Sequence, residues 1–369
     1  MGRANFMFGG ACAVALAVAT WLVSSAQSLP IRDPDGVVVP AYVQIPMILG
    51  LAWLLDVVPR TVGRSRGEWS SFRTHFRAVV RERWNRKHTV FALSGLATWY
   101  VSYAAFRNLK SYVPFVNDHV WDSDLERIDR ALWFGHDPAN VLHSLFGTSF
   151  AAEFFSFIYV SWIVLVPVSI AIALIFTRAP AAGSWYVTAI SLCWGLGVAG
   201  YFSLPTLGPA YSYPGDFADV KSTYTEELVA NLLKDRMAVV PGVPPFGSPG
   251  GDPHGTHVLQ TIAAFPSLHV GIMVTICLFL TLIAANRTFR IVAWTYLVLT
   301  IFATIYFGWH FSLDAVGGFV LGGLAVYLAA IGTGNHVRGV PQLVEHGTHE
   351  DFEPDQDSPE ASSAANRPA

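Results

Sequence analysis

Apolar residues in this chain gather into eight long runs, which are separated by short polar or basic segments. Each run approaches the roughly 20 residues that an α-helix needs to cross about 30 Å of hydrocarbon. The pattern therefore predicts an all-α integral membrane protein with about eight spans. The predicted spans lie near residues 6–26, 38–58, 89–107, 152–177, 185–204, 267–285, 289–308 and 312–332.

The first run can be interpreted in two ways. It follows Arg3 and ends in the small residues of 24–28, which fits either a cleaved signal peptide or an uncleaved membrane anchor. Cleavage changes the number of spans but leaves the rest of the topology as it is.

Composition supports the membrane interpretation. Hydrophobic residues make up 53% of the 369 residues and charged residues only 13%, against about 25% charged in an average soluble domain. The net charge of −3 indicates no nucleic-acid partner, so we expect the partners to be the membrane and its lipids. The three cysteines, Cys12, Cys193 and Cys277, all lie inside apolar runs, and we expect neither a disulfide nor a zinc site.

The distribution of positive charge predicts the orientation. Between the second and third runs only Glu68 and Glu82 oppose nine basic residues, namely Arg60, Arg64, Arg66, Arg73, Arg77, Arg81, Arg83, Arg86 and Lys87. This segment should face the cytoplasm, and its apolar residues recur at the spacing of an amphipathic helix on anionic headgroups. The same topology places 109–150 and 205–265 outside, and we expect a multi-pass protein of the plasma (inner) membrane.

Four parts follow along the chain. Residues 1–60 are expected to form two N-terminal transmembrane helices, 61–88 the basic amphipathic cytoplasmic segment, and 89–332 a membrane domain of six helices with the external loop 205–265. Residues 333–369 are expected to be a cytoplasmic tail, disordered from about 336 onward because it is polar and lacks apolar periodicity.

Two segments outside the spans have the spacing of short helices. Thr223 and Glu226 stand at a capping-box spacing within the external loop. Residues 124–133 are helical in pattern but too charged to cross a membrane, so we expect them to lie flat at the outer interface.

Candidate chemistry lies at both ends of one predicted membrane hairpin. His269 and His310 are 310 − 269 = 41 residues apart, and a descent and a return through the bilayer take about 40 residues. Both histidines should therefore reach the extracytoplasmic face. On a helix, Asp314 can accept the Nδ1 proton of His310, which leaves Nε2 free as a nucleophile. A histidine and aspartate four residues apart can equally be half of a metal site.

His269 is expected in the first turn of the sixth span, just after Pro266, where helix N–H groups and the helix dipole suit a phosphate. There it can act as a general acid. Each histidine taken alone can also be an ordinary interfacial residue.

Further residues are candidates for binding substrate or phosphate, namely Ser267, Arg107, Lys110 and Tyr211. Arg107 and Lys110 stand at the outer end of the third span, where a cation commonly has an anionic partner, although both side chains can also simply reach the headgroups. His254 and His257 in the external loop can contact a headgroup, bind a metal or be solvated.

The segments Phe265–His269 and His310–Asp314 resemble the second signature and the end of the third signature of the type 2 phosphatidic acid phosphatase superfamily, which shares its core with vanadium haloperoxidases. The closer resemblance is to the branch of fungal inositol phosphorylceramide synthase, and it covers about residues 89–332. It implies a six-helix core of the phosphatidic acid phosphatase and haloperoxidase type, preceded here by two further helices.

The resemblance also implies roles for the three residues. His310 would attack phosphorus to form a phosphohistidine, Asp314 would hold its ring, and His269 would protonate the departing oxygen and later activate the acceptor. The chain departs from the family pattern at three places: Ala303-Thr304 replaces Ser-Arg, Leu268 replaces glycine, and 205–211 replaces the Lys…Arg-Pro signature. The phosphate-binding cations must then come from other residues.

These observations lead to one expectation with one alternative. The chain is expected to be an enzyme, a phosphatase or phosphotransferase acting on lipid or polyprenyl phosphate at the extracytoplasmic face, with no metal and no cofactor. Water as the acceptor would make it a phosphatase, and an alcohol would make it a transferase. The alternative is a membrane protein that binds or carries lipid phosphate without cleaving it.

Overall fold

The computed structural model describes residues 5–29, 31, 41–66, 68–176, 179–218, 220–223 and 262–344. Most of the external loop lies outside the described residues, including the expected helix after Thr223 and the histidines His254 and His257. So does the chain after residue 344.

The membrane-length helices agree with most of the predicted spans. Seven described helices are long and apolar enough to cross a membrane: α1 (Met7–Gln27), α2 (Ala41–Ser65), α4 (Arg86–Val116), α7 (Phe150–Ala171) with η2 (Ile172–Phe176), α8 (Pro180–Ser203), α12 (Arg287–Tyr306) and α13 (Ser312–Thr333). The sixth predicted span is the apolar but shorter α11 (Leu268–Leu282). The chain is thus an α-helical membrane protein, and the expected number of eight spans is not confirmed.

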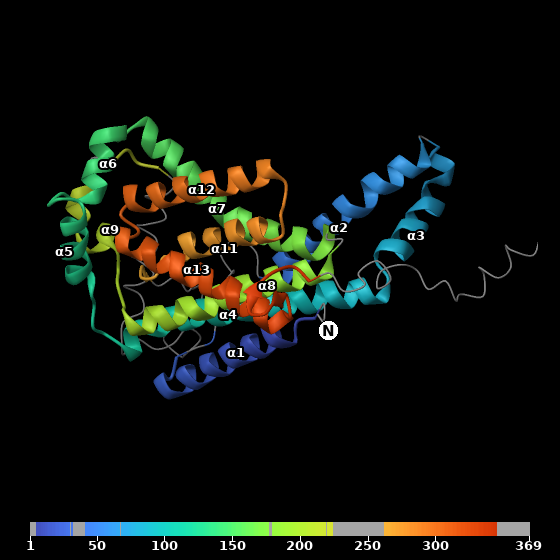
Figure 1. Cartoon of the computed structure of the whole chain (residues 1–369), viewed down its shortest axis with the longest axis horizontal. Helices are drawn as coiled ribbons and strands as arrows, with labels where there is room; N and C mark the ends of the chain where they lie inside the picture. Colours follow the sequence, from blue (N-terminus) through green and yellow to red (C-terminus); the bar gives the residue numbers. More distant parts are fainter. Residues whose placement is uncertain are drawn as a thin grey trace, which may run out of the picture.

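Shorter elements connect these helices. They are η1 (Trp69–Ser71), α3 (Phe72–Arg83), α5 (Asp122–Leu132), α6 (Pro138–Phe146), α9 (Pro209–Ser212) and η3 (Pro214–Phe217). Figure 1 shows α5, α6 and α9 gathered at one end of the long helices, while α2 and α3 project from the other end. The site described below lies at the end with α5 and α9.

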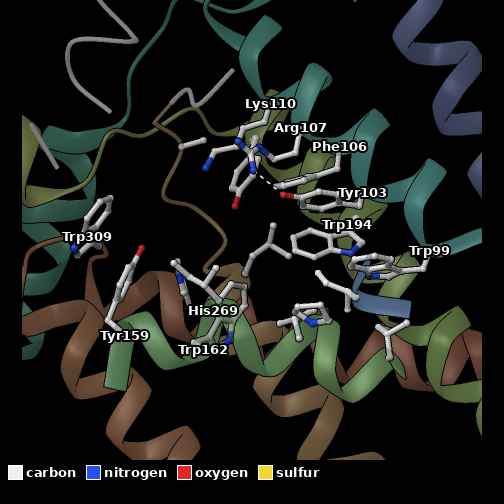
Figure 2. A pocket seen from close by; sticks show the side chains of 18 of the residues that line it. Trp99, Tyr103, Phe106, Arg107, Lys110, Tyr159, Trp162, Trp194, His269 and Trp309 are labelled. Carbon is white, nitrogen blue, oxygen red and sulfur yellow. Dashed lines mark hydrogen bonds between the residues drawn. The ribbon is translucent and has the colours of Figure 1, made fainter. Parts of the chain in front are cut away.

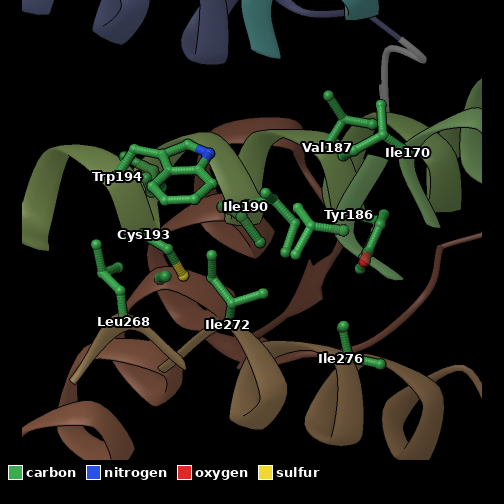
Figure 3. Close-up of a cluster of buried hydrophobic side chains, with 14 of the residues drawn as sticks. Ile170, Tyr186, Val187, Ile190, Cys193, Trp194, Leu268, Ile272 and Ile276 are labelled. Atoms are coloured by element: carbon green, nitrogen blue, oxygen red, sulfur yellow. The ribbon is translucent and has the colours of Figure 1, made fainter. Parts of the chain in front are cut away.

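Helix α8 lies at the centre of the packing. It is apolar all round and buried over most of its length, as expected for a helix surrounded by others. Figure 3 shows Tyr186, Ile190 and Cys193 of α8 facing Leu268 and Ile272 of α11. This contact fixes α11, and with it the segment that carries His269.

Helices α11 and α13 approach each other closely because α13 has glycines where they meet. A side-chain carbon at Gly318 would lie 2.6 Å from the carbonyl oxygen of Ser267, and one at Gly322 would lie 2.4 Å from that of Gly271. Small residues four apart let helix backbones touch in this way. The two helices that hold His269 and Asp314 are therefore held in a fixed relation.

The basic segment forms α3, which packs against α2. Asp56 of α2 is buried and accepts hydrogen bonds from Arg60 Nε at 3.0 Å, Arg83 Nη2 at 3.4 Å and Trp84 Nε1 at 3.3 Å. Arg83 also donates to the carbonyl oxygen of Ile175 in η2 at 3.3 Å. Two of the basic residues therefore hold the protein together, in addition to any contact with headgroups.

The expectation of disorder from about residue 336 is wrong for the first residues of the tail. Strands β1 (His336–Val337) and β2 (Val340–Pro341) pair in antiparallel fashion. The turn between them uses Arg338 and Gly339, which both have positive φ, as a tight two-residue hairpin turn requires. The sequence pattern missed this hairpin because it is too short to show periodicity.

Candidate active site

The structure brings His269, His310 and Asp314 into one chain of contacts. His310 Nδ1 lies 3.2 Å from Asp314 Oδ2, and His310 Nε2 lies 3.2 Å from His269 Nδ1. If Asp314 accepts the Nδ1 proton, Nε2 carries a lone pair and accepts the Nδ1 proton of His269. This proton arrangement leaves a nucleophile facing a proton donor.

Local structure at the two histidines differs from the sequence prediction in one respect. Helix α11 starts at Leu268 with Ser267 as its N-cap, so Pro266 precedes the first turn instead of opening it. Likewise α13 starts at Ser312, and His310 precedes the helix. Asp314 reaches back to His310 because Asp314 Oδ2 also accepts the backbone N–H of Phe311 at 2.9 Å, as acidic residues in the first turn commonly do.

A cavity of about 370 Å³ contains His269 and His310 together with Arg107 and Lys110. Figure 2 shows the two basic side chains of α4 above the ring of His269. Arg107 Nη1 donates to the hydroxyl of Tyr103 at 2.7 Å, and Lys110 Nζ lies 5.5 Å from the centre of the Tyr201 ring. Two cations and two imidazoles thus line one space, which is the composition of an anion site.

Aromatic rings hold His269 in place. The centre of its ring lies 4.4 Å from that of Trp162 and 4.7 Å from that of Tyr159. Tyr159 in turn stacks on Trp309 at 5.2 Å. Such close ring packing limits the rotation of the imidazole, so that its Nδ1 stays directed toward His310.

The two remaining candidates do not line this cavity. The Ser267 hydroxyl is fully buried and accepts the backbone N–H of Val270 at 3.4 Å, as a helix cap. Tyr211 packs edge-on against Trp309 with 6.0 Å between ring centres. Ser267 therefore caps the helix that carries His269, and Tyr211 packs behind Trp309, which lines the cavity.

The sequence interpretation missed the carboxylates of α5. Asp129 is buried and accepts the backbone N–H groups of Ser312 at 2.7 Å and Leu313 at 3.2 Å. Trp133 Nε1 also donates to the Ser312 hydroxyl at 2.8 Å. Because a carboxylate at a helix N-terminus complements its dipole, α5 fixes the start of the helix that carries Asp314. The helix at 124–133 is confirmed, and its role in the site was not predicted.

Asp122, at the other end of α5, organises the segment that follows α8. Its carboxylate accepts the backbone N–H groups of Leu207 at 2.9 Å and Gly208 at 2.8 Å. Gly208 has φ +90°, and a side-chain carbon there would lie 2.5 Å from the carbonyl oxygen of Trp309. Glycine is required at this position, since the backbone passes directly beside the His310 segment. In the sequence, the feature that could have indicated these two residues is that Asp122 and Asp129 are acidic and lie seven positions apart.

The environment of Asp129 changes its acidity. Burial raises the pKa of its carboxyl to about 6 from the ordinary 3.8, and the hydrogen bonds from Ser312 and Leu313 oppose that rise. The nearby Asp314 carboxylate raises it further. The group that fixes the start of α13 therefore changes charge within the physiological range.

A bundle of membrane-length helices with a histidine, histidine and aspartate cluster at one end defines a multi-pass membrane protein with a candidate anion-binding active site. A family model described as the PAP2 superfamily matches residues 123–328, which is more than half of the chain. The chain therefore belongs to the PAP2 superfamily. Comparisons with curated proteins and with solved structures found no match.

The matched region contains His269, His310, Asp314 and Asp129, and it begins one residue after Asp122. It does not reach α4, so Arg107 and Lys110 lie outside it. The cationic wall of the cavity is thus contributed by a part of the chain that precedes the matched segment.

Proposed function

We propose that this protein is a membrane phosphatase or phosphotransferase that acts on lipid phosphate through a phosphohistidine on His310. The observation that carries the proposal is the contact chain from Asp314 through His310 to His269 in a cavity with two cations. Membership of the PAP2 superfamily supports it, because that superfamily generally consists of phosphatases and phosphotransferases.

The first step forms a bond between His310 Nε2 and phosphorus and breaks the bond from phosphorus to the departing oxygen. His269, as the imidazolium that a bound phosphate dianion favours, donates its Nδ1 proton to that oxygen and becomes neutral, and Asp314 stabilises the charge that develops on the His310 ring. The contact between the two histidines has to open when phosphate enters, since an in-line reaction places phosphorus between nucleophile and leaving oxygen.

In the second step the acceptor loses its proton to His269 Nδ1 and attacks phosphorus, and the bond to His310 breaks. Arg107 and Lys110 would hold the phosphoryl oxygens, in place of the cationic signatures that the sequence lacks. In this mechanism the protein needs no metal, and its activity should survive chelation by EDTA.

The acceptor decides between the two activities. The resemblance to the inositol phosphorylceramide synthase branch, which also lacks those cationic signatures, favours an alcohol acceptor, to which the phosphoryl group would pass. Incubation with a labelled lipid phosphate, with and without an alcohol, distinguishes the outcomes: free phosphate identifies a phosphatase and a labelled phosphate ester of the added alcohol identifies a transferase. Binding without either product would instead support a lipid-phosphate carrier.

The decisive test is substitution within the triad of His269, His310 and Asp314. We expect His310→Ala and Asp314→Asn to lower kcat by about 10³-fold or more, since both remove a group that acts in the transition state. His136→Ala, on an exposed histidine near α6, is the matched control and should retain activity. A fully active His310→Ala protein, inserted normally in the membrane, would refute the mechanism.

The proposal also places the site at the extracytoplasmic face of the plasma membrane, because the basic α3 segment belongs to the cytoplasm by the charge rule. His136→Cys should then react with a membrane-impermeant maleimide in intact cells. Reaction only after lysis would reverse the orientation.

A further inference from the structure

The cavity that contains His269 and His310 is much larger than a phosphate requires. Its volume of about 370 Å³ is more than twice that of the roughly 150 Å³ cavity that holds a benzene molecule. Packed protein interiors leave few voids larger than a water molecule. The remaining space therefore fits an organic group attached to the phosphate.

The lining changes character along the cavity. One end has Arg107, Lys110 and the two imidazoles, and the middle has the aromatic rings of α4, α7 and α8, as Figure 2 shows. The other end has only apolar side chains, namely Ile48, Leu49, Leu96, Ile170, Ala171 and Leu174. An occupant with an anionic head and an apolar tail matches this order.

Helix geometry gives the length of this path. From Lys110 to Leu96 the cavity follows 14 residues of α4, or about 21 Å, and from Tyr159 to Ala171 it follows 12 residues of α7, or about 18 Å. These lengths are about two thirds of the roughly 30 Å hydrocarbon thickness of a bilayer. The shape is therefore that of a single long chain and not of a compact ring system.

We propose that the cavity encloses one hydrocarbon chain of the substrate and that the apolar residues of α2 and α7 at its far end set the chain length that is accepted. The proposal rests on the proposed function and names its substrate class: a phosphate ester of a long acyl or isoprenoid chain. Ile48, Leu49 and Leu96 precede residue 123, where the superfamily match begins. The α2 and α4 side of this end is therefore outside the segment that the chain shares with the superfamily model, whereas Ile170, Ala171 and Leu174 lie within it.

Chain enclosure has a measurable consequence. Each methylene group transferred to an apolar site is worth about fourfold in binding. For the wild type, kcat/KM should rise with chain length until the chain reaches the far end and should then level off. A chain that stays in the surrounding bilayer would show no such limit set by the protein.

The experiment uses mixed detergent micelles at constant substrate mole fraction, so that differences in how the substrates partition into the micelles do not determine the rate. One series is monoacylglycerol phosphates with octanoyl, lauroyl, palmitoyl and oleoyl chains, and the other is geranyl and farnesyl phosphate. The variants Leu49→Trp and Ala171→Leu add volume at the far end. Their matched controls, Leu51→Trp and Val168→Leu, lie on the same two helices at exposed positions outside the cavity.

We expect Leu49→Trp and Ala171→Leu to lower kcat/KM for the oleoyl substrate about tenfold while leaving the octanoyl substrate unchanged, so that the plateau comes at a shorter chain. The two controls should match the wild type. Identical chain-length profiles for all five proteins would overturn the proposal while leaving the proposed function intact. The series with the steeper rise identifies acyl or isoprenoid chemistry.

A second measurement does not depend on turnover. An octadecanoyl glycerol phosphate with a diazirine at the end of its chain is photo-crosslinked to the full-length protein, and the modified peptides are identified by mass spectrometry. Adducts at Leu96, Ile170 and Leu174 support enclosure. Adducts confined to exposed α7 residues such as Phe157 and Val164 would overturn it, whether or not the protein is active on any substrate.

Discussion

Two buried carboxylates lie toward opposite ends of the helix bundle, and their partners differ in kind. Asp56 accepts hydrogen bonds from two arginines and a tryptophan. Asp314 accepts from the ring of His310 and from a backbone N–H. Arginine keeps its charge at every accessible pH, whereas an imidazole can give up or take a proton near neutrality. The first cluster can only hold the helices, while the second can also do chemistry.

The cluster around Asp56 also lies beside the apolar end of the cavity. Arg83 links Asp56 to the carbonyl oxygen of Ile175 in η2, and the neighbouring Leu174 lines the apolar end of the cavity. The ion-paired cluster therefore fixes that end, and the histidine cluster occupies the other. A buried carboxylate surrounded by hydrogen-bond donors thus holds helices together at one end of the cavity and belongs to the candidate active site at the other.

Removing the charge of Asp56 should have the largest effect on stability. Asp56→Asn leaves two arginines beside a neutral amide, and we expect a loss of roughly 1–3 kcal/mol in the free energy of unfolding, because the arginines are partly exposed and the full cost of a broken buried pair does not apply. Thermal unfolding in detergent measures this. Glu82→Gln, in the exposed pair with Arg64, is the control and should change stability by about 0.5 kcal/mol or less. Equal effects of the two variants would mean that burial of Asp56 is unimportant.

Removing one cation from the cavity should affect binding. Arg107→Gln takes away a charged donor from the phosphate, so we expect KM to rise about tenfold with a smaller change in kcat. Steady-state kinetics measure both constants. Arg127→Gln removes an exposed arginine paired with Asp124 on α5 and should leave KM unchanged. If both variants keep the wild-type KM, the phosphate is held by other groups.

Titration of Asp129 should have a smaller effect, which makes both the stability and the activity of the protein depend on pH. Its folded pKa of about 6 is above the ordinary 3.8, so protonation stabilises the fold as pH falls through 6 toward about 4. A protonated carboxyl is nevertheless a weaker acceptor for the N–H groups at the start of α13, so activity should fall a few fold over the same range. Asp129→Asn is permanently neutral and should be a few fold less active than the wild type above pH 6.

Below pH 6 the Asp129→Asn variant and the wild type should converge, which separates this carboxyl from the titrating histidines. Asp124→Asn, on the exposed face of α5, is the control. A constant ratio between Asp129→Asn and the wild type at every pH would show that the charge of Asp129 has no part in the pH dependence.

The sequence by itself determined most of the helices. Long apolar runs are readable because hydrocarbon excludes unpaired backbone groups, so that a helix is required wherever such a run crosses the membrane. The distance of 41 residues between His269 and His310 also predicted that they meet, and the 3.2 Å contact of their ring nitrogens confirms it. The pairing of His310 with Asp314 was also predicted, because the two residues are four positions apart, although His310 lies just before the helix.

Only the tertiary structure decided what surrounds those residues. Nothing in the pattern of 124–133 shows that Asp129 caps α13 more than 180 residues later, because such a contact depends on how α5 docks and not on its own periodicity. The apolar end of the cavity likewise combines residues of α2, α4 and α7, whose hydrophobic runs look alike in sequence. Local spacing determines the helices, whereas enclosed space arises only where helices distant in sequence pack incompletely against one another.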